Sequence, residues 1–336
     1  MIPPRAASLL IDHLDSVDAA VGKRLVRKRP WNEVSLTSFL CDLLDETTQE
    51  EENLSFPLTR LNEELAGGEG VLDVNFEIET HEYGPEVERH VTQSDLGLVI
   101  SYEDLITGDR ASTDWLLQAK RLAPFTGSPR QWSPQSRFGG RDPGQHARLQ
   151  QLGKLVGEPF VKYLLYCPRP AAIDEATAKT LAHLRSKQLS GHIFDYALGI
   201  KLHEELARPN SSLAASMFVA ESARPPKTLS QTHTAIFTGC TPFSWFVAEQ
   251  FSPPPFRNSV GFQDPVRGVA PGGSDQQKAL RHGIVTGDPE AVRQLLEELG
   301  GTVDDPAGRF LPAHTMTVKV RAGHMLDPDV RAVRDS

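Results

Sequence analysis

Asp95, Gln118 and Lys120 have the side-chain types and the spacing of a site for a divalent cation and a phosphate. Gln118 and Lys120 are two residues apart in a segment of strand character, so their side chains share one face of the strand. Asp95 lies in the preceding segment of strand character, and its carboxylate is a hard ligand for Mg²⁺. Gln118 and the backbone carbonyl of Ala119 would add neutral oxygens. Lys120 would orient or deprotonate an attacking water and offset charge on the phosphate.

Hydrophobic periodicity predicts the elements that position these residues. Alternating apolar residues predict strands over 71–80, 89–103 and 112–122, and their short connections favour an antiparallel meander. A nearly uninterrupted apolar run over 160–168 predicts a strand that is covered on both faces. Helical spacing and capping residues predict helices over these ranges: 5–26, 33–45, 57–68, from Pro143 onward, 174–189 and 289–299.

The order of helix, meander, helix and strand, with Asp95 in one strand and Gln118-Ala119-Lys120 in the next, resembles the PD-(D/E)XK restriction-endonuclease-like superfamily. It resembles in particular the Q-x-K branch, which includes Mrr-like enzymes. Ser94 stands where the motif has proline, and Gln118 stands where most members have a carboxylate. The resemblance covers roughly residues 31–170 and implies an α/β fold, a mixed sheet flanked by helices, with a C-terminal extension.

This resemblance implies a metal-dependent endonuclease that hydrolyses DNA phosphodiester bonds with Mg²⁺ or Mn²⁺, a type often found in restriction or antiviral defence. In that family the aspartate binds the metal, the glutamine position assists it and the lysine activates water. These roles carry to Asp95, Gln118 and Lys120, with the Ala119 carbonyl as a further metal ligand.

The family also commonly supplies a glutamate from the helix that precedes the meander. Glu33 is the first candidate, because it precedes Leu36 and Leu40 by three and seven residues and so shares the inward face of its helix. Glu63 and Glu64 are the alternatives, because their helix is closer to the strands in sequence.

The same residues also have ordinary structural interpretations. Asp95 can end a strand, Lys120 can extend its charged end from an edge strand, and Glu33 can complement a helix dipole. The competing function is therefore a catalytically silent nuclease-fold subunit that acts as a binding component of a larger defence or transposition complex. A third possibility is a nuclease that acts on RNA or on nucleotides.

Composition excludes several classes of protein. The formal net charge of -9 over 336 residues argues against a protein that coats nucleic acid through bulk positive charge, although a local basic groove still fits a nuclease. The three cysteines are far apart, which excludes a disulfide scaffold and a cysteine-rich zinc module. No signal peptide and no run of 18 apolar residues is recognised, so we expect a cytoplasmic protein with no membrane partner.

We expect three regions along the chain. Residues 1–30 form an N-terminal helix and a basic linker, residues 31–190 the nuclease-like core, and residues 191–336 an accessory region packed on that core. The basic run over 23–29 is interpreted either as a solvated linker or as a contact with a phosphate backbone. The C-terminal region is a candidate for selecting DNA, binding a protein partner or forming a homodimer.

Overall fold

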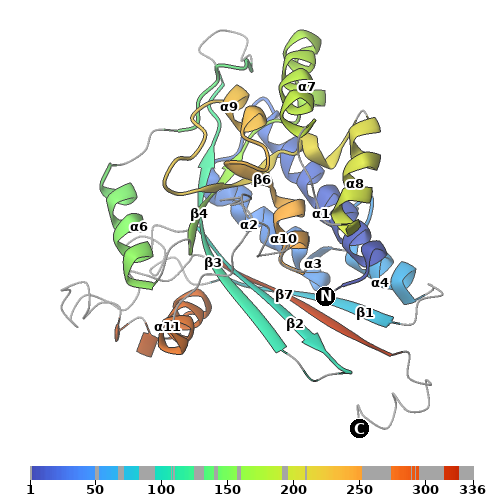
Figure 1. Cartoon of the computed structure of the whole chain (residues 1–336). Coiled ribbons are helices and arrows are strands. Elements are labelled where there is room, and N and C mark those ends of the chain that lie inside the picture. The colour runs from blue at the N-terminus through green and yellow to red at the C-terminus, as the bar shows by residue number, and fades with distance from the viewer. Residues whose placement is uncertain are drawn as a thin grey trace.

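A mixed seven-stranded sheet runs through the protein and carries helices on both of its faces (Figure 1). The computed structural model describes residues 2–49, 53–66, 72–82, 95–106, 108, 110–124, 132–139, 143–156, 160–190, 196–208, 210–251, 274–288, 290–291, 293–294 and 314–324. The strands are β1 (Leu72–Glu82), β2 (Leu96–Asp104), β3 (Arg110–Arg121), β4 (Val161–Tyr166), β5 (Met217–Glu221), β6 (Cys240–Pro242) and β7 (His314–His324). Their order is β1-β7-β2-β3-β4-β5-β6, which confirms the expected α/β class with a mixed sheet between helices.

Helices cover the two faces of the sheet in separate groups. On one face α1 (Pro4–Leu25) packs against α2 (Glu33–Leu44) and α10 (Phe243–Glu249), and α2 also contacts β1, β3 and β7. On the other face α11 (Asp275–Thr286) packs against β2 and β3, with α6 (Pro143–Val156) beside it (Figure 1). Other helices are α3 (Glu46–Gln49), α4 (Leu58–Ala66), α7 (Glu175–Leu189), α8 (Tyr196–Ala207) and α9 (Leu229–Thr234). None of the helices in the described ranges is both long enough and apolar enough to cross a membrane.

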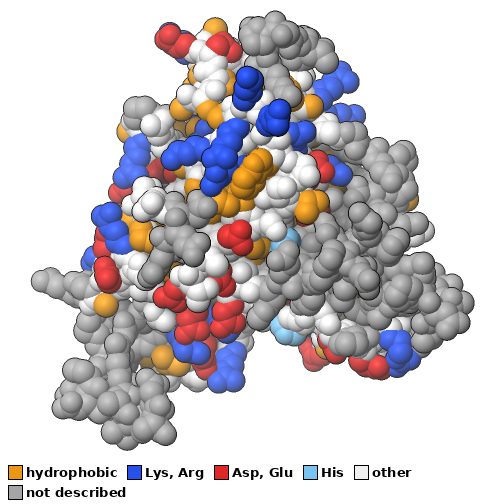
Figure 2. All heavy atoms as spheres, turned by 180° about the vertical axis from the view of Figure 1, so that it is seen from behind, with side chains coloured by type: hydrophobic (Ala, Val, Ile, Leu, Met, Phe, Trp, Pro, Cys, Tyr) orange, Lys and Arg blue, Asp and Glu red, His pale blue; other side chains and the backbone are white. Residues whose placement is uncertain are grey.

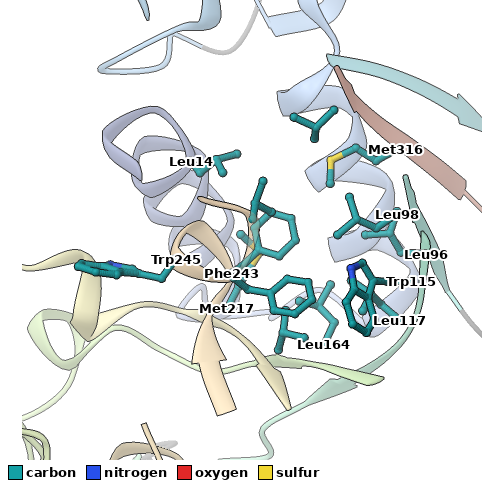
Figure 3. Close-up of a cluster of buried hydrophobic side chains, with 14 of the residues drawn as sticks. Leu14, Leu96, Leu98, Trp115, Leu117, Leu164, Met217, Phe243, Trp245 and Met316 are labelled. Atoms are coloured by element: carbon teal, nitrogen blue, oxygen red, sulfur yellow. The ribbon is translucent and has the colours of Figure 1, made fainter. Parts of the chain in front are cut away.

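The sheet face under α1, α2 and α10 carries a large hydrophobic core (Figure 3). In the register of β2 and β3, Leu96 is opposite Leu117 and Leu98 is opposite Trp115, so these side chains point to the same face. Trp115 is fully buried and meets Phe246 of α10 edge-on, with 5.4 Å between the ring centroids. Burial of each such side chain contributes about 1.5–3 kcal/mol. Because strand residues alternate between faces, the polar residues of β3 point to the other face.

Local sequence signals set the starts of the helices that matter for the site. The Asn32 side chain accepts a hydrogen bond from Ser35 N at 2.8 Å, so α2 begins at Glu33. Asp174 caps α7 in the same way through Thr177 N at 2.9 Å, which confirms the expected cap. The capping residues therefore decide that Glu33 occupies the first turn of its helix.

The expected three-stranded meander is wrong in one respect, because β1 does not pair with β2. β7 lies between them, antiparallel to β1 and parallel to β2. Met316, Val318 and Val320 of β7 are buried in the core. β2 and β3 do form the expected antiparallel pair. The error arose because sequence proximity favours neighbouring strands, whereas β7 comes from the far end of the chain and leaves no local signal of where it pairs.

The region over 191–336 builds the sheet itself, which differs from the expected accessory layer. It supplies β5, β6 and β7, and the segment 217–222, interpreted as an edge strand from its sequence, is β5 with β4 and β6 on its two sides. The N-terminal helix is also part of this body, because the buried carboxylate of Asp18 accepts hydrogen bonds from Ser216 N and Met217 N at the start of β5. Ser94 and residues 289, 292 and 295–299 of the last expected helix lie outside the described residues.

Candidate functional site

The candidate site lies where β3 continues beyond the first residue of β2. Leu96 is paired with Leu117, and Asp95 N donates to Leu117 O at 3.1 Å. β3 runs on to Arg121, so the backbone groups of Ala119 and Arg121 on this edge have no partner in β2. Unpaired backbone donors and acceptors of this kind require other partners. The side chains of Asp95, Gln118 and Glu33 and the backbone N–H of Gly139 supply them.

Asp95 takes the place of the missing strand residue through its side chain. Its Oδ2 accepts the N–H of Ala119 at 2.8 Å and also accepts a short hydrogen bond from Gln118 Nε2. Gln118 Nε2 lies 3.3 Å from Ala119 O, and in a strand the N–H and C=O of one residue point to the same side. The Asp95 carboxylate, the Gln118 amide and the Ala119 carbonyl therefore meet at one point on the edge of β3.

Gln118 has a buried amide oxygen that none of the described residues satisfies. The side chain is 3% exposed, and Oε1 has no hydrogen-bond partner among the described residues, whereas Nε2 is bound to Asp95. Leaving a buried acceptor unpaired costs about 1–3 kcal/mol. In this orientation Nε2, and not Oε1, faces the Asp95 carboxylate and the Ala119 carbonyl. If the amide turns over, Oε1 joins a carboxylate and a backbone carbonyl in a set of hard donors suited to Mg²⁺ or Mn²⁺. The donor chemistry of Asp95, Gln118 and Ala119 thus fits such a cation.

Glu33 reaches the same edge of β3 from the first turn of α2. Its Oε1 accepts the N–H of Arg121 at 2.8 Å, and Arg121 O accepts the N–H of Gly139 at 2.9 Å. Because Ala119 and Arg121 are two residues apart in a strand, the amides held by Asp95 and Glu33 are about 7 Å apart. The structure thus brings Glu33 to the edge of β3 that Asp95 occupies, with the Ala119 carbonyl between them.

Glu63 and Glu64 do not approach this edge. They belong to α4, which packs against α1 and β1, and both β7 and β2 separate β1 from β3. Glu63 is exposed, and Glu64 forms an ion pair with Arg60 on its own helix at 3.0 Å. Of the three glutamates considered, Glu33 is therefore the one that the fold places at the site.

Tyr166 is a further residue of the site that sequence analysis missed. Its hydroxyl is 3.0 Å from Thr37 Oγ1 in the protein interior, and Thr37 Oγ1 also donates to Glu33 O at 3.1 Å. Burial raises the pKa of Tyr166 well above its usual value, and the nearby charges of Asp95 and Glu33 raise it further. A tyrosine inside the apolar run over 160–168 was the available signal, because a buried hydroxyl needs a partner. Tyr166 ties the first turn of α2 to β4 and so positions Glu33.

Lys120 lies on the same strand face as Gln118 and is half-buried. It lines a pocket of about 560 Å³, to which Arg137 and Lys227 contribute two more cations. Gly139 also lines this pocket, and a Cβ added there would lie 3.6 Å from Glu33 Oε1. The pocket therefore adjoins the edge of β3 at which Asp95 and Glu33 lie.

Within the described ranges, no three His, Cys, Asp or Glu side chains come together as a metal site. A cation here would rely on one or two carboxylates, Asp95 and Glu33, and on the neutral oxygens of Gln118 and Ala119.

The chain matches no protein-family model, no curated protein and no solved structure. The functional conclusion therefore depends on the geometry of the site. The arrangement of Asp95, Gln118 and Ala119 supports binding of a hard cation beside a pocket of basic side chains.

Proposed function

We propose that the protein is a metal-dependent endonuclease that hydrolyses DNA phosphodiester bonds, of the PD-(D/E)XK type in its Q-x-K form. The observation that carries the proposal is the convergence of the Asp95 carboxylate, the Gln118 amide and the Ala119 carbonyl at the end of β3. Lys120 follows one residue later on the Gln118 face.

Each residue has a defined role in this proposal. Asp95, Gln118 and the Ala119 carbonyl would hold Mg²⁺ or Mn²⁺, with Glu33 on the same strand edge. When bound, the cation supplies Lewis-acid stabilisation of the phosphate and a lowered pKa for a bound water. Lys120 donates hydrogen bonds from its ammonium group to a phosphate oxygen or to the attacking water, which offsets the negative charge that develops on the phosphate. Tyr166 holds α2, and with it Glu33, in place.

The surface near the site supports an anionic substrate despite the net charge of -9. In the basic run over 23–29, Lys23, Arg27, Lys28 and Arg29 are exposed. Arg24 lies over the Trp31 ring, 4.9 Å from its centroid, and Trp31 O accepts a hydrogen bond from Arg121 Nη1 at 3.1 Å.

The run over 23–29 therefore ends beside the strand edge that Glu33 contacts. Local cations of this kind bind phosphate backbones. Figure 2 shows that Lys and Arg side chains gather around hydrophobic side chains in the upper part of one face, whereas Asp and Glu side chains gather lower on the same face.

A second candidate function is a catalytically silent nuclease-fold subunit that binds a partner within a defence or transposition complex. The observation that favours it is the state of Asp95, whose Oδ2 is already satisfied by Ala119 N and Gln118 Nε2 without a cation. Gln118 in place of a carboxylate also removes one negative charge from the metal ligands. Both features would suit a site that has lost catalysis and kept its structure.

Cleavage assays on purified protein test the nuclease. Supercoiled plasmid, linear duplex, single-stranded DNA and RNA are incubated in Mg²⁺, Mn²⁺ or EDTA with wild type, Asp95→Ala, Lys120→Ala and the surface control Lys179→Ala. We expect metal-dependent cleavage that falls by about 100-fold or more in the first two variants, because each removes a transition-state contact, and is unchanged in the control.

Circular dichroism and thermal melts must show that all four proteins fold. A folded wild type that cleaves none of the substrates, and whose melting temperature does not rise with either cation, would contradict the nuclease and favour the silent subunit. Cleavage of RNA alone would contradict the DNA assignment.

A further inference from the structure

The pocket beside Lys120 is a built feature of the fold. Its floor includes Tyr163 and Leu165 of β4, which are opposite Gln118 and Lys120 in the strand register. One wall is the segment 137–139 and another is the segment 225–228.

Backbone hydrogen bonds connect these two walls to each other and to the sheet. Phe138 N donates to Lys227 O at 3.2 Å, and Leu229 N donates to Ser136 O at 3.0 Å. Gly139 N donates to Arg121 O at 2.9 Å, which joins the first wall to β3. The pocket is thus held in shape by the backbone and is formed before any ligand binds.

The charge of the pocket selects an anion. Lys120, Arg137 and Lys227 line it, and no Asp or Glu is among its described lining residues. Arg137 and Lys227 are exposed at the mouth, whereas Lys120 is half-buried on the sheet. Three cations that line one pocket are suited to phosphate, which accepts charge-assisted hydrogen bonds from both residue types.

The rest of the lining is suited to a flat apolar ring. Phe138 is half-buried, Tyr163 is 2% exposed, and Pro225 and Pro226 are buried, so apolar side chains line the pocket together with the three cations. Aromatic and apolar walls next to basic groups are the combination that binds nucleotides, through stacking of the base and pairing of the phosphate. A volume of about 560 Å³ is in the range of pockets for small ligands and is too small for a duplex.

We propose that this pocket receives one unpaired nucleotide of the substrate strand, with its phosphate among Lys120, Arg137 and Lys227 and its base against Phe138. The inference rests on the proposed nuclease function, because Lys120 belongs to both sites and Gly139 separates the pocket from Glu33. A base within an intact duplex cannot enter such a pocket without leaving the stack. The preferred substrate is therefore a single strand or a duplex with unpaired nucleotides near the cleavage point.

Binding measurements in EDTA test the pocket without any cleavage. The probes are a fluorescein-labelled single-stranded tetranucleotide, a blunt duplex of the same label and dTMP as competitor. The test variant is the double variant Arg137→Ala/Lys227→Ala. The matched control is Arg60→Ala/Lys278→Ala, which also removes one arginine and one lysine from the surface, at side chains that are 56% and 59% exposed.

We expect the single strand to bind wild type and control equally, and the test variant at least about tenfold more weakly, because two charged contacts are lost. In a plot of the logarithm of the binding constant against the logarithm of salt concentration, the test variant should have a slope that is less steep than that of wild type by about 1.4. This change corresponds to the loss of two phosphate contacts of a single strand. A 2-aminopurine base in the tetranucleotide should be quenched on binding to wild type and less quenched on binding to Phe138→Leu.

Three results would overturn the proposal. Equal affinities of the test variant and the control would show that the strand does not use this pocket. Equal binding of the duplex and the single strand would show that no unpaired nucleotide is needed. Displacement by dTMP at the concentration at which the unlabelled tetranucleotide displaces the probe would assign the pocket to a free nucleotide. None of these results depends on the cleavage assay, so failure of the pocket and failure of the nuclease remain distinguishable.

Discussion

The Asp95 carboxylate connects the two parts of the site, the strand edge and the candidate cation ligands. Oδ2 closes the edge of β3 through Ala119 N at 2.8 Å and at the same time holds the amide of Gln118. The orientation of this amide follows from its donor group facing the carboxylate, which leaves Oε1 without a partner among the described residues. A bound cation would favour the opposite orientation of the Gln118 amide, because a cation binds the amide oxygen and not the N–H group. Gln118 is therefore the residue at which the presence of a metal has the clearest physical consequence.

Gln118→Glu should destabilise the protein in EDTA and be rescued by Mg²⁺. The substitution removes the hydrogen bond from Nε2 to Asp95 and places a second carboxylate against the first, so the free energy of unfolding should fall by about 1–3 kcal/mol. Thermal melts in EDTA and in millimolar Mg²⁺ measure this. Gln151→Glu, at an exposed position of α6, is the control. A Gln118→Glu protein that is as stable as wild type in EDTA, or that gains no more from Mg²⁺ than the control does, would contradict a cation site here.

α2 brings Glu33 to the site because the helix is held both at its first residues and at Thr37. Asn32 caps its first residues, and Thr37 joins it to β4 through the Tyr166 hydroxyl. Just before the helix, the backbone carbonyl of Trp31 accepts a hydrogen bond from the Arg121 side chain of β3. These contacts fix the position of the Glu33 carboxylate relative to β3 more closely than hydrophobic packing of α2 alone would.

Tyr166→Phe should reduce both stability and cleavage, each by a modest amount. Loss of the hydrogen bond to Thr37 should lower the free energy of unfolding by about 1 kcal/mol, because Thr37 Oγ1 keeps its bond to Glu33 O. Cleavage should fall by less than in Asp95→Ala, because Tyr166 acts only through the position of Glu33. A double-mutant cycle with Thr37→Val measures the coupling. Additive effects of the two substitutions on cleavage would argue against this positioning role.

The attachment of α11 to β3 should weaken as the pH rises above neutrality. His282 Nδ1 lies 3.0 Å from Asp114 Oδ1, and this hydrogen bond raises the pKa of His282 above its usual value of 6.5. A raised histidine pKa stabilises the folded protein below the unfolded-state value, and this contribution is lost as the pH rises through the folded-state value. His282 is half-exposed, so the contribution should stay below about 1 kcal/mol.

Urea unfolding at pH 5.5 and pH 8.5 of wild type, His282→Gln and the exposed control His183→Gln checks this expectation. The free energy of unfolding of wild type should exceed that of His282→Gln at pH 5.5, and this excess should disappear at pH 8.5. The difference between wild type and His183→Gln should be the same at both pH values. If the excess stability of wild type over His282→Gln grew with pH, the result would contradict the ion pair.

The two ends of the chain meet in one sheet, and this determines what can be removed. β7 supplies an inner strand, with Met316, Val318, Val320 and Ala322 buried at 0–2% exposure. α1 is tied to the start of β5 through Asp18, which also pairs with Arg169 at 2.7 Å. The regions 1–30, 31–190 and 191–336 therefore contribute to one hydrophobic core.

A chain that ends before His314 should fail to fold. Removal of β7 exposes the facing edges of β1 and β2 and strips four buried side chains from the core, a loss comparable with the whole stability of about 5–15 kcal/mol of a typical domain. Circular dichroism and limited proteolysis of the shortened chain measure this. A chain that ends at His324 is the control and should fold. A shortened chain with a cooperative melt would show that residues 1–313 form a core without β7.

The sequence by itself determined the features that depend on short stretches of chain. The alternation in 71–80 and 112–122, the apolar run over 160–168 and the cap at Asp174 each predicted an element that is present. The shared face of Gln118 and Lys120 followed from strand geometry in the same way. These predictions succeeded because period and capping are local properties of the backbone.

Only the tertiary structure decided which elements are neighbours. It placed β7 between β1 and β2, selected Glu33 over Glu63 and Glu64, and brought Tyr166 to Thr37. It also formed the basic pocket from segments around residues 120, 138 and 227, which are far apart in sequence. The physical reason is that pairing between distant segments depends on the burial and hydrogen bonding of the whole sheet, and neither quantity is encoded within a single stretch of the chain.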